Sequence, residues 1–178
     1  MKLDRGRTAL AVVDVQEGFR SAVLDFDRVA HNVATLVRGA RILGLPVLVT
    51  EQYPKGLGGT VPEVAEQLEG VTRMEKLSFS ALDADGFSSA LGGRDQVLLC
   101  GIESHVCVNQ TADDLLTSGR GVHVVQDAVT SRTAENRELG LHKMEHGGAV
   151  VTSVETALFE LLRAAGTPEF KEIQALIK

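Results

Sequence analysis

The sequence predicts an α/β fold in which a parallel sheet of six strands lies between layers of helices. Short apolar runs alternate with amphipathic stretches from one end of the chain to the other. Such alternation indicates βαβ units with right-handed crossovers. The chain has 178 residues, 44% of them hydrophobic, and contains no repeat or linker. We therefore expect one domain over residues 1–178, since this length suffices for a full core.

Six apolar runs are expected to form the strands. The run from Thr8 to Val13 is nearly continuous, as is typical of a strand covered on both faces. Pro46 directly precedes the second run, and the fourth ends in Cys100 and Gly101. The expected strands span residues 8–13, 47–49, 71–76, 96–101, 121–126 and 149–152.

The segments between the strands are expected to form helices. Apolar residues recur at helical spacing from Val29 to Leu43, and Gly44 ends this helix. Residues 53–68 are rich in Gly and Pro, which is typical of a functional loop with a helical turn. The expected helices span residues 29–43, 87–91, 105–118, 134–146 and 154–165, and the tail after Pro168 is a candidate helix.

The bulk properties exclude several classes of partner. The net charge is −6 and no basic patch is present, so we do not expect nucleic acid to bind. No apolar run reaches the length of a membrane span, and the first residues carry charges where a signal peptide needs an apolar core. We therefore expect a cytoplasmic protein without membrane contact, in which Cys100 and Cys107 are free thiols.

Cys107 is the most informative residue of the chain. It lies in the segment 101–108, between the expected fourth strand and the next helix. Backbone N–H groups point outward at such a turn, and the helix dipole favours an anion such as a thiolate. This setting is typical of a reactive cysteine. Cys100, inside the strand, fits the alternative interpretation of a cysteine as a small buried hydrophobe.

Two charged residues are expected beside Cys107. Asp14 follows the first strand and Lys76 ends the third, and parallel α/β sheets bind ligands at the carboxyl ends of their strands. Asp14 would take the thiol proton and later deliver it to a leaving group. Lys76 would stabilise the thiolate and hold Asp14 ionised. The alternative is that Asp14 only caps a turn or pairs with a lysine.

Three blocks of sequence resemble the isochorismatase-like cysteine hydrolases, a superfamily that includes nicotinamidases and N-carbamoylsarcosine amidase. The blocks are residues 11–16 with Phe19, residues 76–80 and residues 101–108, in family order, and the similarity covers about residues 5–163. Residues 50–58 also resemble the branch named isochorismatase-domain-containing proteins. The resemblance implies a three-layer, Rossmann-like fold around a six-stranded parallel sheet.

The resemblance also implies a catalytic triad of Asp14, Lys76 and Cys107. It implies a non-proline cis peptide between Ile102 and Glu103, and an oxyanion hole made by the backbone N–H groups of Glu103 and Cys107. By family position Phe19 and Phe79 line the pocket. The expected substrate-binding residues are Gln16, Phe19, Gln52, Tyr53 and Phe79.

The expected function is hydrolysis of a small amide-like substrate through a thioester on Cys107. Enzymes that hydrolyse isochorismate cleave a vinyl ether without a cysteine, so Cys107 argues against that reaction. Metal-binding nicotinamidases carry an Asp-x-His pair after the second strand, where this chain has Glu51-Gln52-Tyr53. We therefore expect no metal and no cofactor. By resemblance we expect a homo-oligomer, either a dimer or a tetramer.

Other interpretations remain open from the sequence. The protein could be a redox-responsive or small-molecule-binding module that uses a low-pKa thiol without turnover, or a structural subunit of an oligomer. Asp14 and Lys76 disfavour both, because a sensor has little need of a proton shuttle. His105 is expected to face away from Cys107, and His142 with His146 is expected on a solvated helix face rather than in a metal site.

Overall fold

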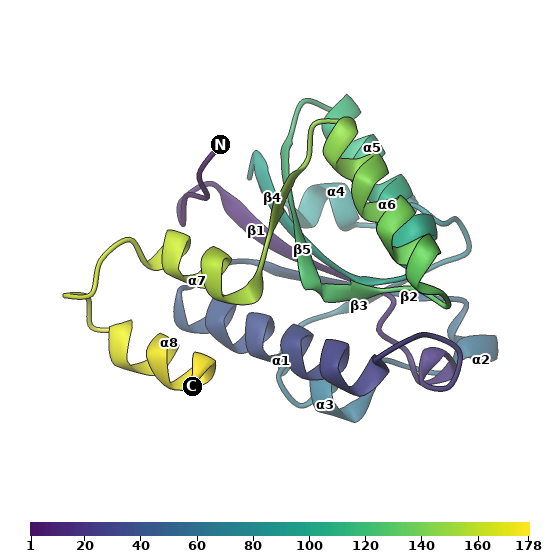
Figure 1. The fold of residues 1–178 in the computed structure, drawn as a ribbon, viewed down its shortest axis with the longest axis horizontal. Coiled ribbons are helices and arrows are strands. Elements are labelled where there is room, and N and C mark those ends of the chain that lie inside the picture. Colours follow the sequence, from purple (N-terminus) through teal and green to yellow (C-terminus); the bar gives the residue numbers. More distant parts are fainter.

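The computed structural model describes all residues from 1 to 178, and its single sheet contains six parallel strands (Figure 1). The strand order is β3-β2-β1-β4-β5-β6, which confirms the predicted six-stranded parallel sheet. β1 and β4 lie at the centre, where the strand order reverses. The strands are β1 (Thr8–Val13), β2 (Val47–Gln52), β3 (Arg73–Lys76), β4 (Gln96–Ile102), β5 (Gly121–Thr130) and β6 (Val150–Thr152).

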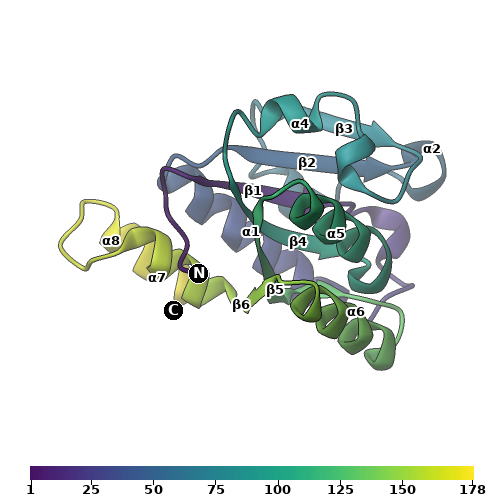
Figure 2. The same ribbon diagram turned by 90° about the horizontal axis from the view of Figure 1, so that it is seen from above.

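Helices cover both faces of the sheet and complete a three-layer architecture (Figure 1, Figure 2). A further short helix, α2 (Pro54–Leu57), lies in the loop after β2. No helix is both long enough and apolar enough to cross a lipid bilayer. One layer contains α1 (Phe26–Ile42), α3 (Pro62–Ala65), α7 (Val154–Leu162) and α8 (Phe170–Ile177), and the other contains α4 (Phe87–Ala90), α5 (Asn109–Thr117) and α6 (Ala134–His146).

The sheet divides the core into two clusters, because successive side chains of a strand point to opposite faces. Leu10 and Val12 of β1 pack on the side of α1, whereas Ala9, Ala11 and Val13 pack on the side of α5. All residues of β1 are buried. Burial on both faces explains why this strand appears in the sequence as a continuous apolar run.

Several elements extend beyond the apolar patterns that predicted them. β2 continues to Gln52, and its polar end pairs with β3 as far as Lys76. β5 continues to Thr130. Backbone hydrogen bonds can extend a strand whatever its side chains, whereas the prediction used apolar runs alone. The helix predicted from His105 begins as a π-helical turn, Ser104–Val108, and then continues as α5.

Gly101 lets the two central strands approach each other beside the candidate site. Its φ is +124°, and a Cβ at this position would lie 2.0 Å from the carbonyl oxygen of Val13. Only glycine meets both constraints, because it has no Cβ and accepts positive φ. The carboxyl ends of β1 and β4 therefore stay close. Asp14 directly follows β1, and the turn that carries Cys107 follows β4. This is the point of strand reversal at which α/β folds bind ligands.

Candidate active site

Asp14 lies directly after β1, with its side chain fully buried. Its φ of +53° is a left-handed conformation that ends the strand. Lys76 Nζ donates a hydrogen bond to Oδ2 at 2.7 Å, and Thr50 Oγ1 donates to Oδ1 at 2.7 Å. Both carboxylate oxygens thus have a donor from a neighbouring strand region, which fixes the carboxylate at the rim of the sheet.

Lys76 ends β3, and acceptors surround its ammonium group. Besides Asp14, Nζ donates to Gln52 Oε1 at 2.8 Å and to the backbone carbonyls of Phe79 at 3.0 Å and Ser78 at 3.2 Å. The Lys76 side chain is 1% exposed. A buried charge is tolerated only when it is paired and hydrogen-bonded, and both conditions hold here. The structure therefore joins Asp14 and Lys76 in one buried ion pair.

Cys107 lies in the π-helical turn after β4 and is 4% exposed. Its thiol lies near enough to Asp14 for each group to affect the pKa of the other. The Cys107 carbonyl accepts a hydrogen bond from Thr111 Oγ1 at 2.7 Å, and this hydroxyl accepts one from the Ala81 N–H at 2.9 Å. Thr111 thus links the turn to the loop that follows Lys76. The structure brings Asp14, Lys76 and Cys107 into one buried cluster.

The electrostatics of this cluster differ from the sequence-based expectation. Burial, and then the negative charge of Asp14, raise the pKa of the Cys107 thiol to about 12. The charge of Lys76 acts in the opposite direction but is outweighed. Burial also raises the pKa of Asp14, against the opposing effect of Lys76. The expected effect of Lys76, which favours the thiolate, is present, but burial of the turn and the charge of Asp14 outweigh it. A neutral thiol therefore lies beside the Asp14–Lys76 pair.

Glu103 begins the turn that carries Cys107, and the peptide bond between Ile102 and Glu103 is cis. The Glu103 carbonyl accepts hydrogen bonds from the N–H groups of Val106 at 3.1 Å and Val108 at 3.2 Å. The Glu103 N–H donates to no backbone or side-chain acceptor in the chain. This donor is free to bind a ligand.

Two of the expected substrate-binding residues, Gln16 and Gln52, form hydrogen bonds to each other and to neighbouring segments of the chain. Gln16 is fully buried; its Nε2 donates to the carbonyls of Gln52 at 2.9 Å and Gly58 at 2.7 Å, and its Oε1 accepts from the Gln52 N–H at 2.7 Å. Gln52 binds Lys76 through Oε1 and the Leu77 carbonyl through Nε2. Both amides therefore hold Lys76 and the loop after β2 in place.

The three aromatic candidates differ in exposure. Phe19 packs against the edge of the core on the α1 side. Tyr53 and Phe79 are about half exposed, and Leu77 beside them is 77% exposed. The loop after Lys76 and the neighbouring Tyr53 thus expose large side chains to solvent.

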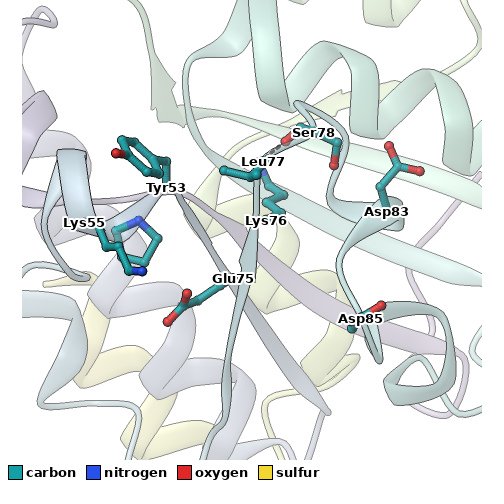
Figure 3. Close-up of a pocket in the computed structure, with 9 residues that line it drawn as sticks. Tyr53, Lys55, Glu75, Lys76, Leu77, Ser78, Asp83 and Asp85 are labelled. Carbon is teal, nitrogen blue, oxygen red and sulfur yellow. Dashed lines mark hydrogen bonds between the residues drawn. The ribbon is translucent and has the colours of Figure 1, made fainter.

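A pocket of about 610 Å³ opens on this side of the molecule (Figure 3). Tyr53 and Lys55 lie on one side of it, Asp83 and Asp85 on the other, and Lys76 between them. The buried thiol is not part of the pocket wall. The pocket therefore adjoins the catalytic candidates through the Lys76 segment rather than through the cysteine.

Two residues that contact the turn with Cys107, Ser131 and Arg132, were not identified from the sequence. Ser131 Oγ lies 2.7 Å from Ser104 Oγ and 3.0 Å from His105 Nδ1, so His105 pairs with Ser131 and not with Cys107. Arg132 binds the Glu103 carboxylate with 2.7 Å between Nη2 and Oε2. These residues follow β5 and contact a turn nearly thirty residues earlier in the chain. No local pattern reports such a contact.

The sequence matches the family model described as the isochorismatase domain over residues 8–156. A secreted isochorismatase effector, Isc1, from Phytophthora sojae is 46% identical over 177 residues, which cover 96% of this chain and 84% of the relative. Isochorismatase domain-containing protein 2 from Danio rerio is 42% identical over 178 residues, which cover 99% of this chain and 89% of the relative.

Solved structures also align with this chain over nearly its whole length. A structure described as MAR1 ribonuclease from Caenorhabditis elegans aligns with a TM-score of 0.96 and 42% identity, covering 99% of this chain and 92% of that one. YcaC from Pseudomonas aeruginosa, described with covalent acrylamide, aligns with a TM-score of 0.90 and 28% identity, covering 98% and 91%. YcaC from Escherichia coli, described as an octameric hydrolase of unknown specificity, aligns at 0.87 and 25% identity, covering 98% and 95%. The chain belongs to the isochorismatase-like hydrolase superfamily.

Proposed function

We propose that this protein hydrolyses a small amide-like C–N bond through a thioester on Cys107, with neither metal nor cofactor. The observation that carries the proposal is the position of Asp14, which is hydrogen-bonded to the buried Lys76 ammonium and lies near enough to the Cys107 thiol to raise its pKa. A carboxylate that touches a thiol can accept its proton, and a fixed ammonium can stabilise the thiolate that results.

Acylation begins with proton transfer between the neighbouring thiol and carboxylate. The Cys107 proton moves to Asp14, and the negative charge moves from oxygen to sulfur. The net charge of the buried cluster stays the same, so the step avoids the cost of creating an additional buried charge. The sulfur then attacks the substrate carbonyl carbon, and the carbonyl electrons move onto oxygen. The N–H groups of Glu103 and Cys107 stabilise this oxyanion.

The tetrahedral intermediate collapses when Asp14 gives its proton to the departing nitrogen. The C–N bond breaks, ammonia or an amine leaves, and the acyl group remains on Cys107 as a thioester. Asp14, ionised again, takes a proton from the water that attacks the thioester and returns it to the sulfur as the acid leaves. One water is consumed, and the starting protonation states are restored.

The substrate-binding residues divide into two groups in this proposal. Tyr53 and Phe79, which are half exposed beside the loop after Lys76, contact the substrate, and Phe19 supports the same wall from the core. Gln16 and Gln52 act through the groups that they position. The covalent acrylamide described for the P. aeruginosa relative is consistent with a small amide as ligand.

The test is a panel of small primary amides, ureas and N-carbamoyl acids, assayed for ammonia release. Acid-quenched samples analysed by intact mass spectrometry should carry an acyl group on Cys107, and Cys107→Ala should abolish turnover and adduct together. Only oxidation products on Cys107, with no ammonia from any compound, would support the redox-responsive module instead. The raised pKa of Cys107 disfavours that module, because it would need a thiolate at neutral pH.

Cleavage of RNA is a second candidate only because the C. elegans relative is described as a ribonuclease. The present chain has a net charge of −6, and its pocket is bordered by Glu75, Asp83 and Asp85 against a single projecting lysine, Lys55. Phosphate contacts dominate affinity for nucleic acid, and this surface offers few groups that could make them. We therefore favour the amide-like substrate.

We further propose that the protein is a cytoplasmic homo-oligomer, a dimer or a tetramer. The octamer described for the E. coli relative and the exposed Leu77 and Phe79 support self-association. The P. sojae relative is described as secreted, so not every relative of this chain is cytoplasmic. Light scattering coupled to size exclusion measures the assembly directly, and a monomer at micromolar concentration would contradict the proposal.

A further inference from the structure

Two consecutive residues after β5 hold three consecutive residues at the start of the turn that carries Cys107. Ser131 Oγ bonds to Ser104 Oγ and His105 Nδ1, at 2.7 Å and 3.0 Å. Arg132 bonds to the side chain of Glu103. The segment therefore contacts the part of the turn that presents the free Glu103 N–H.

The contact between Arg132 and Glu103 has the geometry of a strong ion pair. Glu103 Oε1 accepts from the Arg132 backbone N–H at 3.1 Å and from Nε at 3.0 Å, and Oε2 accepts from Nη2 at 2.7 Å. Burial acts to raise the pKa of Glu103, but the hydrogen bonds and charge of Arg132 outweigh it and lower the pKa. Glu103 is therefore ionised at neutral pH, and the guanidinium holds it at two oxygens.

The exposures of the two side chains show which residue depends on the other. The Glu103 side chain is 5% exposed, whereas that of Arg132 is 62% exposed. A buried carboxylate without its cation would have to move toward water or take up a proton. Because the carbonyl of Glu103 is already bonded to Val106 and Val108, such a movement would turn the peptide that carries the Glu103 N–H.

We propose that Arg132 is a positioning residue for the oxyanion hole. Its ion pair with Glu103 aims the Glu103 N–H at the substrate oxygen, while Ser131 holds the next two residues of the turn. Arg132 itself does not contact the substrate. This inference rests on the proposed function, since it concerns the donor that stabilises the oxyanion of that reaction.

The rates of two reactions at Cys107, compared with each other, distinguish this role from general support of the turn. With p-nitrophenyl acetate, the thiol proton passes to Asp14, the C–S bond forms through an oxyanion, and p-nitrophenolate leaves. With allyl bromide, the thiol proton again passes to Asp14, the C–S bond forms as the C–Br bond breaks, bromide leaves, and no oxyanion arises. The burst of p-nitrophenolate measures the first rate, and intact mass measures the second. Cys107→Ala gives the background from other nucleophiles.

We expect Arg132→Gln to slow acylation by about 10-fold to 100-fold, because removing an oxyanion donor outright costs about 100-fold to 1,000-fold in other enzymes. Its allylation rate should stay within about twofold of the wild-type rate. Arg132→Lys keeps the charge with one donor and should recover part of the acylation rate. Arg7→Gln is the matched control, because Arg7 forms a similar two-point pair with Asp95 on an exposed surface.

Equal losses in both reactions would overturn the inference, since they would show that Arg132 supports the whole turn. Unchanged acylation in Arg132→Gln would overturn it as well. A wild-type protein that reacts with allyl bromide but not with the ester would instead contradict the proposed function. If Arg132→Gln does not fold, Arg132→Lys gives the same comparison of the two rates.

Discussion

Asp14 carries more of the proposed chemistry than any other single residue, because it is hydrogen-bonded to Lys76 and lies near enough to Cys107 to affect the pKa of that thiol. Its charge has two opposite effects on the thiol. As a base it accepts the proton of Cys107, but as a neighbouring anion it raises the pKa of that thiol. The first effect serves catalysis and the second keeps the resting cysteine neutral, so a single substitution should separate them.

In Asp14→Asn the pKa of the Cys107 thiol should fall, since the anion that raises it is gone and Lys76 remains. Iodoacetamide should then alkylate Cys107 with a pH midpoint below that of the wild type. Amide turnover should fall by about 100-fold to 10,000-fold, because no group protonates the leaving nitrogen. Rates of alkylation against pH, beside ammonia release, measure both. A pH midpoint higher than in the wild type would contradict the assigned effect of Asp14.

Among the elements, β5 and α6 provide the support for the turn that carries Cys107. The segment after β5 contributes Ser131, and α6 packs against the turn through Gly140. A Cβ at Gly140 would lie 2.6 Å from the backbone carbon and oxygen of Ser104 and 2.7 Å from the backbone nitrogen of His105. The close approach of this helix therefore depends on the absence of a side chain.

Gly140→Ala should displace the turn and lower turnover by about 10-fold or more, with a loss of about 1–3 kcal/mol in the free energy of unfolding from overpacking. The neighbouring backbone atoms cannot move aside as a flexible side chain would. Glu138→Ala, on the exposed face of the same helix, is the control and should change neither quantity appreciably. Urea unfolding and steady-state rates measure the two effects, and a fully active Gly140→Ala would show that the turn tolerates the shift.

His123 in β5 is buried, and neither of its ring nitrogens has a hydrogen-bond partner. Burial lowers its pKa in the folded state, so the unfolded chain binds the proton more tightly. Its effect is therefore to reduce stability as the pH falls through the ordinary histidine range of about 6.5. The free energy of unfolding of His123→Leu should change less between pH 7.5 and about 5.5 than that of the wild type. His142→Ala, on the exposed side of α6, is the control.

At the scale of the whole molecule, the sheet ties all other elements together, since each face of it carries one of the two core clusters. We expect residues 1–178 to unfold as one cooperative unit. Cys100, inside β4 at the centre of the sheet, provides a probe of the core. In a Cys107→Ala background, labelling of Cys100 and loss of helical circular dichroism should share one urea midpoint. Two separate midpoints would contradict a single domain.

The net charge of −6 also leads to a prediction for the whole molecule. We expect no binding to single-stranded or double-stranded RNA at physiological salt, because few phosphate contacts are available. Fluorescence anisotropy of labelled RNA, with a basic RNA-binding protein as the positive control, measures this. RNA cleavage that is lost in Cys107→Ala would contradict the prediction. It would show that the site acts on nucleic acid instead of a small amide.

The sequence by itself determined the parallel sheet and the rim at which Asp14, Lys76 and Cys107 meet. Apolar runs mark buried strands, and parallel connections bring the ends of those strands to one edge, so both follow from local patterns. The π-helical turn before α5 and the polar ends of β2 and β5 were not predictable in this way, because they depend on backbone pairing rather than on side-chain hydrophobicity.

Only the tertiary structure decided the protonation of the site and its supporting contacts. The pKa of Cys107 depends on how deeply the turn is buried and on the nearby Asp14 charge, which are properties of the packed molecule. Gly140 and Arg132 contact the turn from segments far along the chain. Such contacts depend on how helices and loops pack in three dimensions, and they leave no periodicity in the sequence that could reveal them.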